Sequence, residues 1–276
     1  RDPDGFGVLV SDEKASVQLL AFPAAGSATI TKTLKLDAGS DTECDFEGAA
    51  FTDGFFYLTG SHGVTKKKGK IEKSRSRVYR FKIAASGTAI ESVGKSTLSN
   101  LIANDPVLSP FHRKSLQQSG INIEGLAAHR GQLYFGFRNP SIAGHGFVLE
   151  IAASALFNSA KPDYTLHKIK LDDGLGIREL AALPDGSFLV LTGNAGSEAN
   201  KKFPKSENHH RGRGYHLFSW TPGAACQQVA SIPVPPGKAE ALLVLGQTAN
   251  QSEFVVLYDS APDGSPQRFT LTTPKT

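Results

Sequence analysis

Short runs in which apolar and polar residues alternate recur along the whole chain, separated by turns rich in Gly, Pro, Asp and Asn. Alternation with a period of two is the pattern of a β-strand with one buried face. Clear cases are RVYRFKIA at 77–84, FVLEIA at 147–152 and YHLFSW at 215–220. No apolar run approaches the roughly 18–20 residues of a membrane-spanning helix. The pattern predicts an all-β protein without a membrane span.

Four segments of the chain resemble one another, which indicates a repeat architecture. Each has a glutamate, then small or aliphatic residues, a turn, and a second apolar strand. The first three turns contain TDG, HRG or LPDG, which favour tight hairpins, and the fourth turn is longer. The segments are CDFEGAAFTDGFFYLTGSHG (44–63), INIEGLAAHRGQLYFGFRNP (121–140), GIRELAALPDGSFLVLTGNAG (176–196) and GKAEALLVLGQTANQSEFVVLYDSA (237–261).

A third alternating strand follows each segment, and a fourth, more polar strand follows the first three. This unit, with strands A to D, is the four-stranded antiparallel blade of a β-propeller. The N-terminal runs FGVLV, ASVQLLAF and ATITKTLKL add further strands, and we expect one terminus to complete the blade of the other. We predict a single propeller domain over residues 1–276 with five blades, six being the alternative, and a partly helical insertion near 94–120.

The repeated glutamates point to a site at the propeller axis, because the A strands line the central channel. Glu47, Glu124, Glu179 and Glu240 are expected to form a ring at one height. Like charges at short range raise one another's pKa, and a hard cation such as Ca²⁺ would compensate them, with Asp259 as a further ligand. In the alternative interpretation each glutamate accepts backbone N–H bonds from the neighbouring blade. The two interpretations are compatible.

Two basic runs, TKKKGKIEKSRSR (65–77) and KKFPKSENHHRGRGYH (201–216), fall in B–C loops, which open on the same face as the glutamates. Such a rim would bind phosphate, carboxylate or sulfate groups, although charge runs also serve as solvated loops. Aromatic residues for base stacking are scarce in these loops, so nucleic acid is disfavoured as a partner. The candidate substrate-binding residues are Lys66, Lys67, Lys68, Asn194, His209, His210, Arg211 and Arg213.

His62, Arg138 and Asn139 come just after a B strand and are the candidate catalytic residues at the channel mouth. His62 is suited to act as a general acid or base, or as a ligand. The alternative is a turn histidine that is hydrogen-bonded to its own loop.

The composition adds expectations about processing and redox state. The chain has no methionine, which predicts a processed N-terminus and hence export to the periplasm or the medium. Cys44 and Cys226 allow one disulfide or remain unpaired thiols. We expect a monomer.

NIEGLAAHRGQLYFGFRNP, LGIRELAALPDGSFLVLTGNAG and the closing KAEALLVL and EFVVLYDSAPDGSPQRFTL resemble a bacterial propeller family of unknown function. More distantly, glutamates at the start of inner strands are similar to those of phytase-like esterases and calcium-activated nucleotidases. That similarity implies a central Ca²⁺ and hydrolysis of phosphoesters or phosphoanhydrides. The chain departs from those families at Arg178-Glu179-Leu180, which replaces the Glu-Gly pair in the third repeat.

Together these patterns predict a metal-dependent hydrolase of phosphorylated or other anionic small molecules. The rival hypothesis is a non-catalytic module that binds a protein, a polysaccharide or a cell-surface polymer and holds a structural metal.

Overall fold

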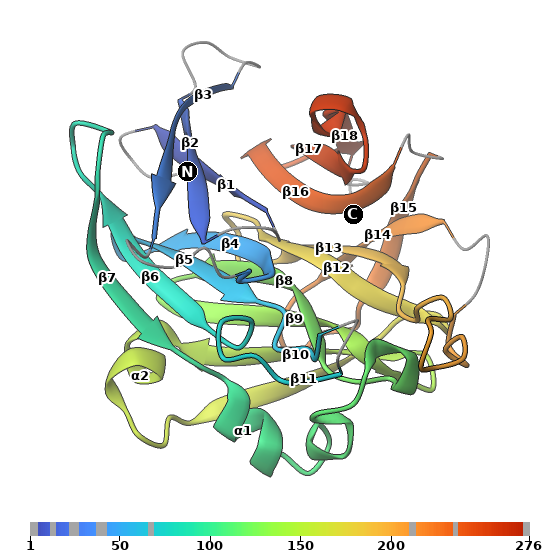
Figure 1. Ribbon diagram of the computed structural model, residues 1–276. Coiled ribbons are helices and arrows are strands. Elements are labelled where there is room, and N and C mark those ends of the chain that lie inside the picture. Colours follow the sequence, from blue (N-terminus) through green and yellow to red (C-terminus); the bar gives the residue numbers. More distant parts are fainter. Residues whose placement is uncertain are drawn as a thin grey trace.

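The computed structural model describes residues 5–11, 15–21, 28–36, 43–65, 69–209, 214–233 and 237–272. Five antiparallel sheets follow one another in chain order around a common centre (Figure 1). The first and fifth sheets, which contain the two ends of the chain, are neighbours in the ring. The predicted five-bladed β-propeller is therefore confirmed.

The strands of each sheet form a meander that starts at an inner strand. The first sheet contains β1 (Phe6–Val10), β2 (Ser16–Ala21) and β3 (Thr29–Lys35). The second contains β4 (Phe46–Thr52), β5 (Phe55–Gly60), β6 (Val78–Ile83) and β7 (Ile90–Ser96). The third contains β8 (Asn122–His129), β9 (Gln132–Ile142), β10 (His145–Ala152) and β11 (Tyr164–Lys170). The fourth contains β12 (Leu175–Ala182), β13 (Phe188–Asn194), β14 (Tyr215–Trp220) and β15 (Gln227–Ile232), and the fifth β16 (Lys238–Gln247), β17 (Gln251–Asp259) and β18 (Gln267–Thr272).

The two terminal sheets differ from the prediction. Each has three strands, and in the described part of the chain no strand of the first sheet pairs with a strand of the fifth. The expectation that one terminus completes the blade of the other is wrong. The runs around β1–β3 pair with one another in sequence order, so they form a sheet of their own.

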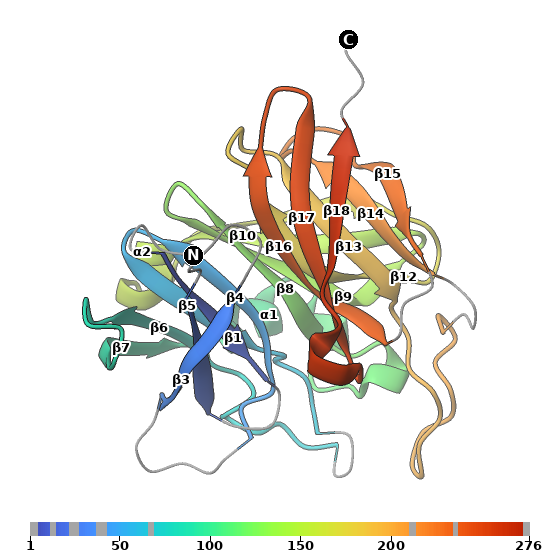
Figure 2. The ribbon, with the colours of Figure 1, turned by 90° about the horizontal axis from the view of Figure 1, so that it is seen from above.

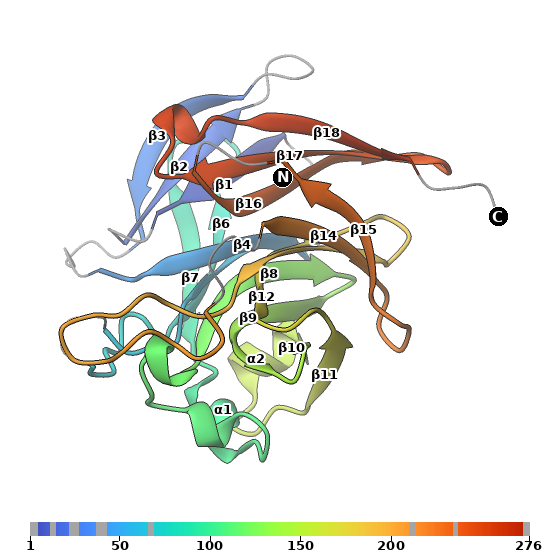
Figure 3. The same ribbon diagram turned by 90° about the vertical axis from the view of Figure 1, so that its right-hand side faces the viewer.

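The segment near 94–120 is partly helical, as predicted. It contains α1 (Ser99–Asn104) and the 3₁₀ turns η1 (Ser109–Phe111) and η2 (Leu116–Gln118). A second short helix, α2 (Ala153–Asn158), follows β10, and a third 3₁₀ turn, η3 (Pro262–Gly264), follows β17. Figure 3 shows α1 beside the third sheet, far from the first and fifth. No helix among the described residues is long and apolar enough to cross a membrane.

Apolar clusters join successive sheets. Leu19 of the first sheet packs with Phe56 of the second, Tyr57 of the second with Phe135 of the third, and two further clusters link the third to the fourth and the fourth to the fifth. None of these four clusters of described residues joins the fifth sheet to the first.

The β5–β6 loop, the β13–β14 loop and η3 extend from the same side of the propeller (Figure 2). The predicted common face of the B–C loops is therefore present. The glutamate-bearing ends of the inner strands lie on this side, because Phe46 pairs with Gly60 and Lys238 with Asp259 at the ends of the B strands.

Cys44 and Cys226 are not joined by a disulfide. Cys44 is buried, with its Sγ 3.9 Å from the hydroxyl of Tyr79. Burial raises the pKa of the Cys226 thiol to about 12, so this thiol is unreactive at neutral pH.

Candidate active site

Each of the inner strands β4, β8, β12 and β16 contains a β-bulge close to its start, where the register with the next strand shifts by one residue. A bulge leaves one residue outside the ladder and re-aims its side chain. The residues at the four shifts are, in chain order, Glu47, Glu124, Arg178 and Glu240. They line one common cavity at the centre of the propeller.

The register corrects the sequence alignment in the third repeat. Arg178, and not Glu179, occupies the position of the other glutamates, while Glu179 corresponds to Gly48 and Gly125. The sequence contains a signal for this register, because Leu-Ala-Ala follows two residues after both Glu124 and Arg178. The ring is therefore three carboxylates and one guanidinium.

Arg178 lies between the carboxylates of the two neighbouring sheets. Its Nε is 3.0 Å from Oε2 of Glu124, and its Nη2 forms an ion pair with Oε1 of Glu240. The side chain is buried, at 3% exposure. A buried ion pair of this kind needs good geometry on both partners, and here one cation serves two anions.

Arg138 approaches Glu124 from the other side. Its Nη1 is 3.0 Å from Oε1 of Glu124. Its Nε donates to the carbonyls of Asn194 and Ala195, both at 3.2 Å, and its Nη2 donates to the Gly196 carbonyl at 2.8 Å. Arg138, a predicted catalytic residue, is thus engaged by protein acceptors, and it fixes the start of the β13–β14 loop to the ring.

Glu47 has an unusual electrostatic environment. Burial, followed by the negative charges of Glu124, Asp45 and Glu240, raises its pKa well above the usual range, against a smaller opposing effect of Arg178. This shift favours the protonated form of the Glu47 carboxyl group. Burial also raises the pKa of Glu240, although the charge of Arg178 opposes the shift.

Glu179 links two blades. Its Oε1 accepts hydrogen bonds from the backbone N–H of Leu126 on the third sheet, at 3.0 Å, and from its own neighbour Leu180, at 2.8 Å. This is the blade-linking role that the sequence offered as the alternative to metal binding. Burial raises the pKa of Glu179 in spite of these two bonds.

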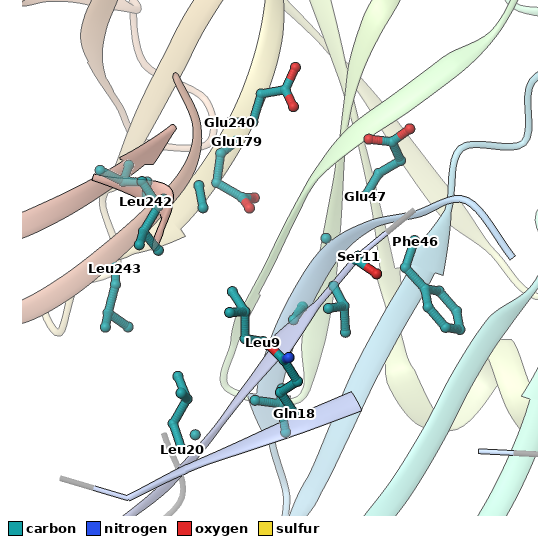
Figure 4. A pocket seen from close by; sticks show the side chains of 18 of the residues that line it. Leu9, Ser11, Gln18, Leu20, Phe46, Glu47, Glu179, Glu240, Leu242 and Leu243 are labelled. Carbon is teal, nitrogen blue, oxygen red and sulfur yellow. The ribbon is translucent and has the colours of Figure 1, made fainter. Parts of the chain in front are cut away.

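The central cavity has a volume of about 590 Å³ and extends from the ring to the space between the first and fifth sheets. Figure 4 shows Glu47, Glu179 and Glu240 at its polar end. Leu9 and Leu20 lie on one side of the remaining space, and Leu243 on the other. The cavity thus has an acidic end and apolar walls.

The described residues do not fit a resident metal ion. No group of three or more His, Cys, Asp or Glu side chains among them is arranged to hold one. Glu124 and Glu240 are engaged by Arg178, and Asp259 by Lys238, whose Nζ is 2.7 Å from Oδ2. The bond from Lys238 is the main cause of a lowered pKa of Asp259. The calcium ligand set stays a prediction.

His62 is buried in the loop after β5 and does not line the cavity. Its Nδ1 lies 2.9 Å from the Gly60 carbonyl, and the N–H of Leu98 donates to its Nε2 at 3.2 Å. Burial lowers its pKa to about 4, so the ring is neutral. This geometry matches the alternative of a turn histidine, which here also ties the second sheet to the helical insertion.

The other predicted polar residues form a network that holds the β13–β14 loop. Asn208 Nδ2 donates to Oδ1 of the fully buried Asn139 at 3.0 Å. Asn194 Nδ2 lies 2.9 Å from His209 Nδ1, and His209 Nε2 lies 3.1 Å from Glu198 Oε1. These contacts are within the protein and outside the cavity lining.

The remaining rim candidates lie outside the described residues, so the cationic rim stays a prediction. They are Lys66, Lys67, Lys68, His210, Arg211 and Arg213.

One known protein family matches most of the chain. The model of the family described as "Protein of unknown function (DUF3616)" matches residues 8–86 and 81–270. The chain belongs to this family. The family resemblance seen in the repeats is thereby confirmed. No curated protein matches the DUF3616 chain.

Similar solved structures include other proteins with low sequence identity. A luciferin-regenerating enzyme has 10% identity and a TM-score of 0.46, covering 99% of this chain and 75% of that one. The GH43_1 enzyme from Xanthomonas citri complexed with xylose has 13% identity and a TM-score of 0.44, covering 83% and 70%. The β-propeller domain of Nup133 from Vanderwaltozyma polyspora has 12% identity and a TM-score of 0.36, covering 99% and 71%. With scores this low, the fold assignment rests on the sheet topology.

Proposed function

We propose that the central cavity is a hydrolytic site for small, uncharged molecules, with Glu47 as proton donor and Glu240 as proton acceptor. The observation that supports this most is the convergence of carboxyl groups from four sheets on one cavity. Arg178, the only arginine in the described lining, is already paired with two of them. Paired carboxyl groups in different protonation states are the usual equipment for hydrolysis of glycosidic bonds.

The proposed reaction needs only the chain's own groups and water. Glu47 gives its proton to the leaving oxygen of the scissile C–O bond as that bond breaks. Glu240, whose side chain is 32% exposed and thus accessible from the cavity, takes a proton from the attacking water. The water oxygen forms the new C–O bond. Glu240 then releases the proton it took to solvent, and solvent supplies one proton to Glu47, so both groups return to their starting forms.

The charge of the residues at the polar end of the cavity determines which class of substrate can bind there. Four carboxyl groups and Arg178 line the polar end, and Arg178 is engaged by two of them. A phosphate ester placed there would meet like charges, which disfavours it. Calcium-dependent hydrolysis of an anionic substrate, predicted from the sequence, would have to use the rim residues that lie outside the described part of the chain.

Chromogenic substrates test the proposal. Purified protein is assayed with p-nitrophenyl glycosides, p-nitrophenyl acetate and p-nitrophenyl phosphate, with and without chelator. We expect nitrophenol release from a glycoside, insensitive to chelator and lowered at least a hundredfold by Glu47→Gln. The matched control, Glu91→Gln, changes an exposed glutamate of β7. Chelator-sensitive release from the phosphate ester alone would instead support the sequence prediction.

A second candidate is a small-molecule binding site without turnover. It is favoured by the lining itself, which contains no His or Cys among the described residues. Binding of a glycoside that is not cleaved, and that Glu47→Gln leaves unchanged, would identify this function.

A further inference from the structure

Among the described residues, the first and fifth sheets each have one face that belongs to none of the four apolar clusters. In the first sheet Leu20 pairs with Gly7 and Ile30, so these residues share a face with Leu9, opposite the face that carries Leu19. Leu19 is buried against the second sheet, whereas Ile30 is 52% exposed. The apolar face of Leu9, Leu20 and Ile30 is therefore left open.

The fifth sheet repeats this arrangement. Leu257 pairs with Ala241, and Leu243, two residues further along β16, lies on the same face. The opposite face, with Leu242 and Val256, is buried against the fourth sheet. Leu243 and Leu257 are only partly buried.

These two open faces line the same cavity as the carboxylates. Leu9, Leu20, Ile30, Leu243 and Leu257, which we call the slot, all border the volume that reaches Glu47 and Glu240. Figure 4 shows the labelled members of the first sheet opposite Leu243, with the carboxylates beyond them. The interface between the fifth and first sheets is thus an apolar space that continues from the polar end of the cavity.

We propose that the slot binds the aliphatic chain of an amphiphilic small molecule whose uncharged, hydroxylated head group lies at Glu47 and Glu240. This inference deepens the proposed function by naming the substrate class. The volume, about 590 Å³, lies within the range of small-molecule sites. Hydroxyl groups suit the head position because they can accept from a protonated carboxyl group and donate to an ionised one.

The slot is continuous with the carboxylate site, and this favours a small molecule over a second copy of the chain as its occupant. A protein partner would cover the apolar faces but would shut the carboxyl groups of Glu47 and Glu240 off from water, and burying polar groups without new hydrogen bonds is costly. An amphiphile satisfies both ends at once.

Calorimetric titration with alkyl β-D-glucosides, below the micelle concentration, tests the slot. From methyl to octyl glucoside we expect the affinity to rise about fourfold per methylene group until the slot is full. Octanoate, with the same chain and a carboxylate head, should bind at least tenfold more weakly than octyl glucoside. Equal affinity for the methyl and octyl compounds would overturn the proposal.

Variants locate the binding. Leu243→Trp should lower the affinity for octyl glucoside at least tenfold and leave methyl glucoside within twofold. The control Val93→Trp changes an exposed apolar residue on β7, away from the slot, and should change neither affinity. Leu20→Gln gives a second test if Leu243→Trp does not fold. Unchanged octyl glucoside binding in a folded slot variant would refute the assignment.

Two controls separate this proposal from its rivals. If affinity rises with alkyl chain length but no glycoside is turned over, the slot is supported and the hydrolytic function is refuted. In Glu47→Gln, turnover should be abolished while affinity still rises with chain length. A stable dimer in light scattering that Leu243→Trp dissociates would show instead that a second copy occupies the slot.

Discussion

The guanidinium of Arg178 lies 3.0 Å from the carboxylate of Glu124, and both side chains leave the bulge position of neighbouring inner strands. One blade therefore supplies the positive charge that the carboxylates of the other blades require. The ring needs no bound cation to hold Glu124 and Glu240 together, because Arg178 pairs with both. This relationship makes Arg178 the central electrostatic element of the site.

Removing Arg178 should be strongly destabilising. Arg178→Gln leaves Glu240 without its cation and Glu124 with Arg138 alone, and breaking a buried pair typically costs about 3–5 kcal/mol. Urea unfolding followed by the fluorescence of Trp220, the single tryptophan, measures the loss. The double variant Arg178→Gln/Glu124→Gln should recover part of the stability. If the two losses simply add, the residues are not coupled.

Calcium should distinguish the observed ring from the ring predicted from the sequence. Arg178→Glu creates four carboxylates at the four bulges, so this variant should gain thermal stability in millimolar calcium and lose it in chelator. The parent protein should melt at the same temperature in both, because Arg178 supplies the charge. A melting temperature of the parent that rises with calcium would show that the predicted calcium site exists.

Glu47 should oppose stability at neutral and alkaline pH. Its pKa is raised in the folded protein, so above pH 4.5 the folded state binds more protons than the unfolded state, and stability falls as the pH rises. Glu47→Gln removes this contribution and should raise the melting temperature at pH 8 more than at pH 4.5. The exposed control Glu91→Gln should leave the pH profile of the parent intact. A lower melting temperature of Glu47→Gln at pH 8 would mean that Glu47 is ionised in the fold.

His62 should make the protein sensitive to acid. Its pKa falls from 6.5 to about 4 on folding, so between these values only the unfolded state takes up the proton. The stability that this provides is complete above pH 6.5 and is lost as the pH falls towards 4, by about 3 kcal/mol in all. In His62→Gln this loss of unfolding free energy at low pH should disappear from denaturation curves measured between pH 7 and 4. His145→Gln, which changes a half-buried histidine at the start of β10 whose Nδ1 lies 2.9 Å from the Ala143 carbonyl, is the control and should keep the parent profile.

The sequence predicted the fold because the strands carry local signals. Alternation and turn residues located the strands from β1 to β18 almost to their ends, since each strand of a hairpin carries its own pattern of buried and exposed residues. The pairing of the terminal strands could not be predicted in this way. Whether β1 joins β2 or β18 depends on contacts across the ring, and local patterns do not contain them.

The sequence predicted where the site lies but not which chemical groups form it. Glu47, Glu124 and Glu240 lie at the positions that the repeats predict. Arg178 was not recognised as the equivalent residue of the third repeat, because the alignment matched glutamate with glutamate and so placed Glu179 there. His62 shows the second limit. A histidine after a strand has the same sequence signal whether it faces a cavity or, as here, donates to Gly60 and accepts from Leu98.

The glycines that follow the bulges should prove necessary for blade packing. A Cβ on Gly48 would lie 2.7 Å from the Cβ and 2.9 Å from the backbone nitrogen of Leu126, on the neighbouring inner strand. Backbone atoms cannot yield without moving the third sheet, so Gly48→Ala should destabilise the protein by about 1–3 kcal/mol, the usual cost of overpacking. Gly246→Ala on β16, where a Cβ meets nothing within 4 Å, is the matched control and should be neutral or slightly stabilising. Equal stabilities of the two variants in urea unfolding would show that the inner strands are not packed as closely as described.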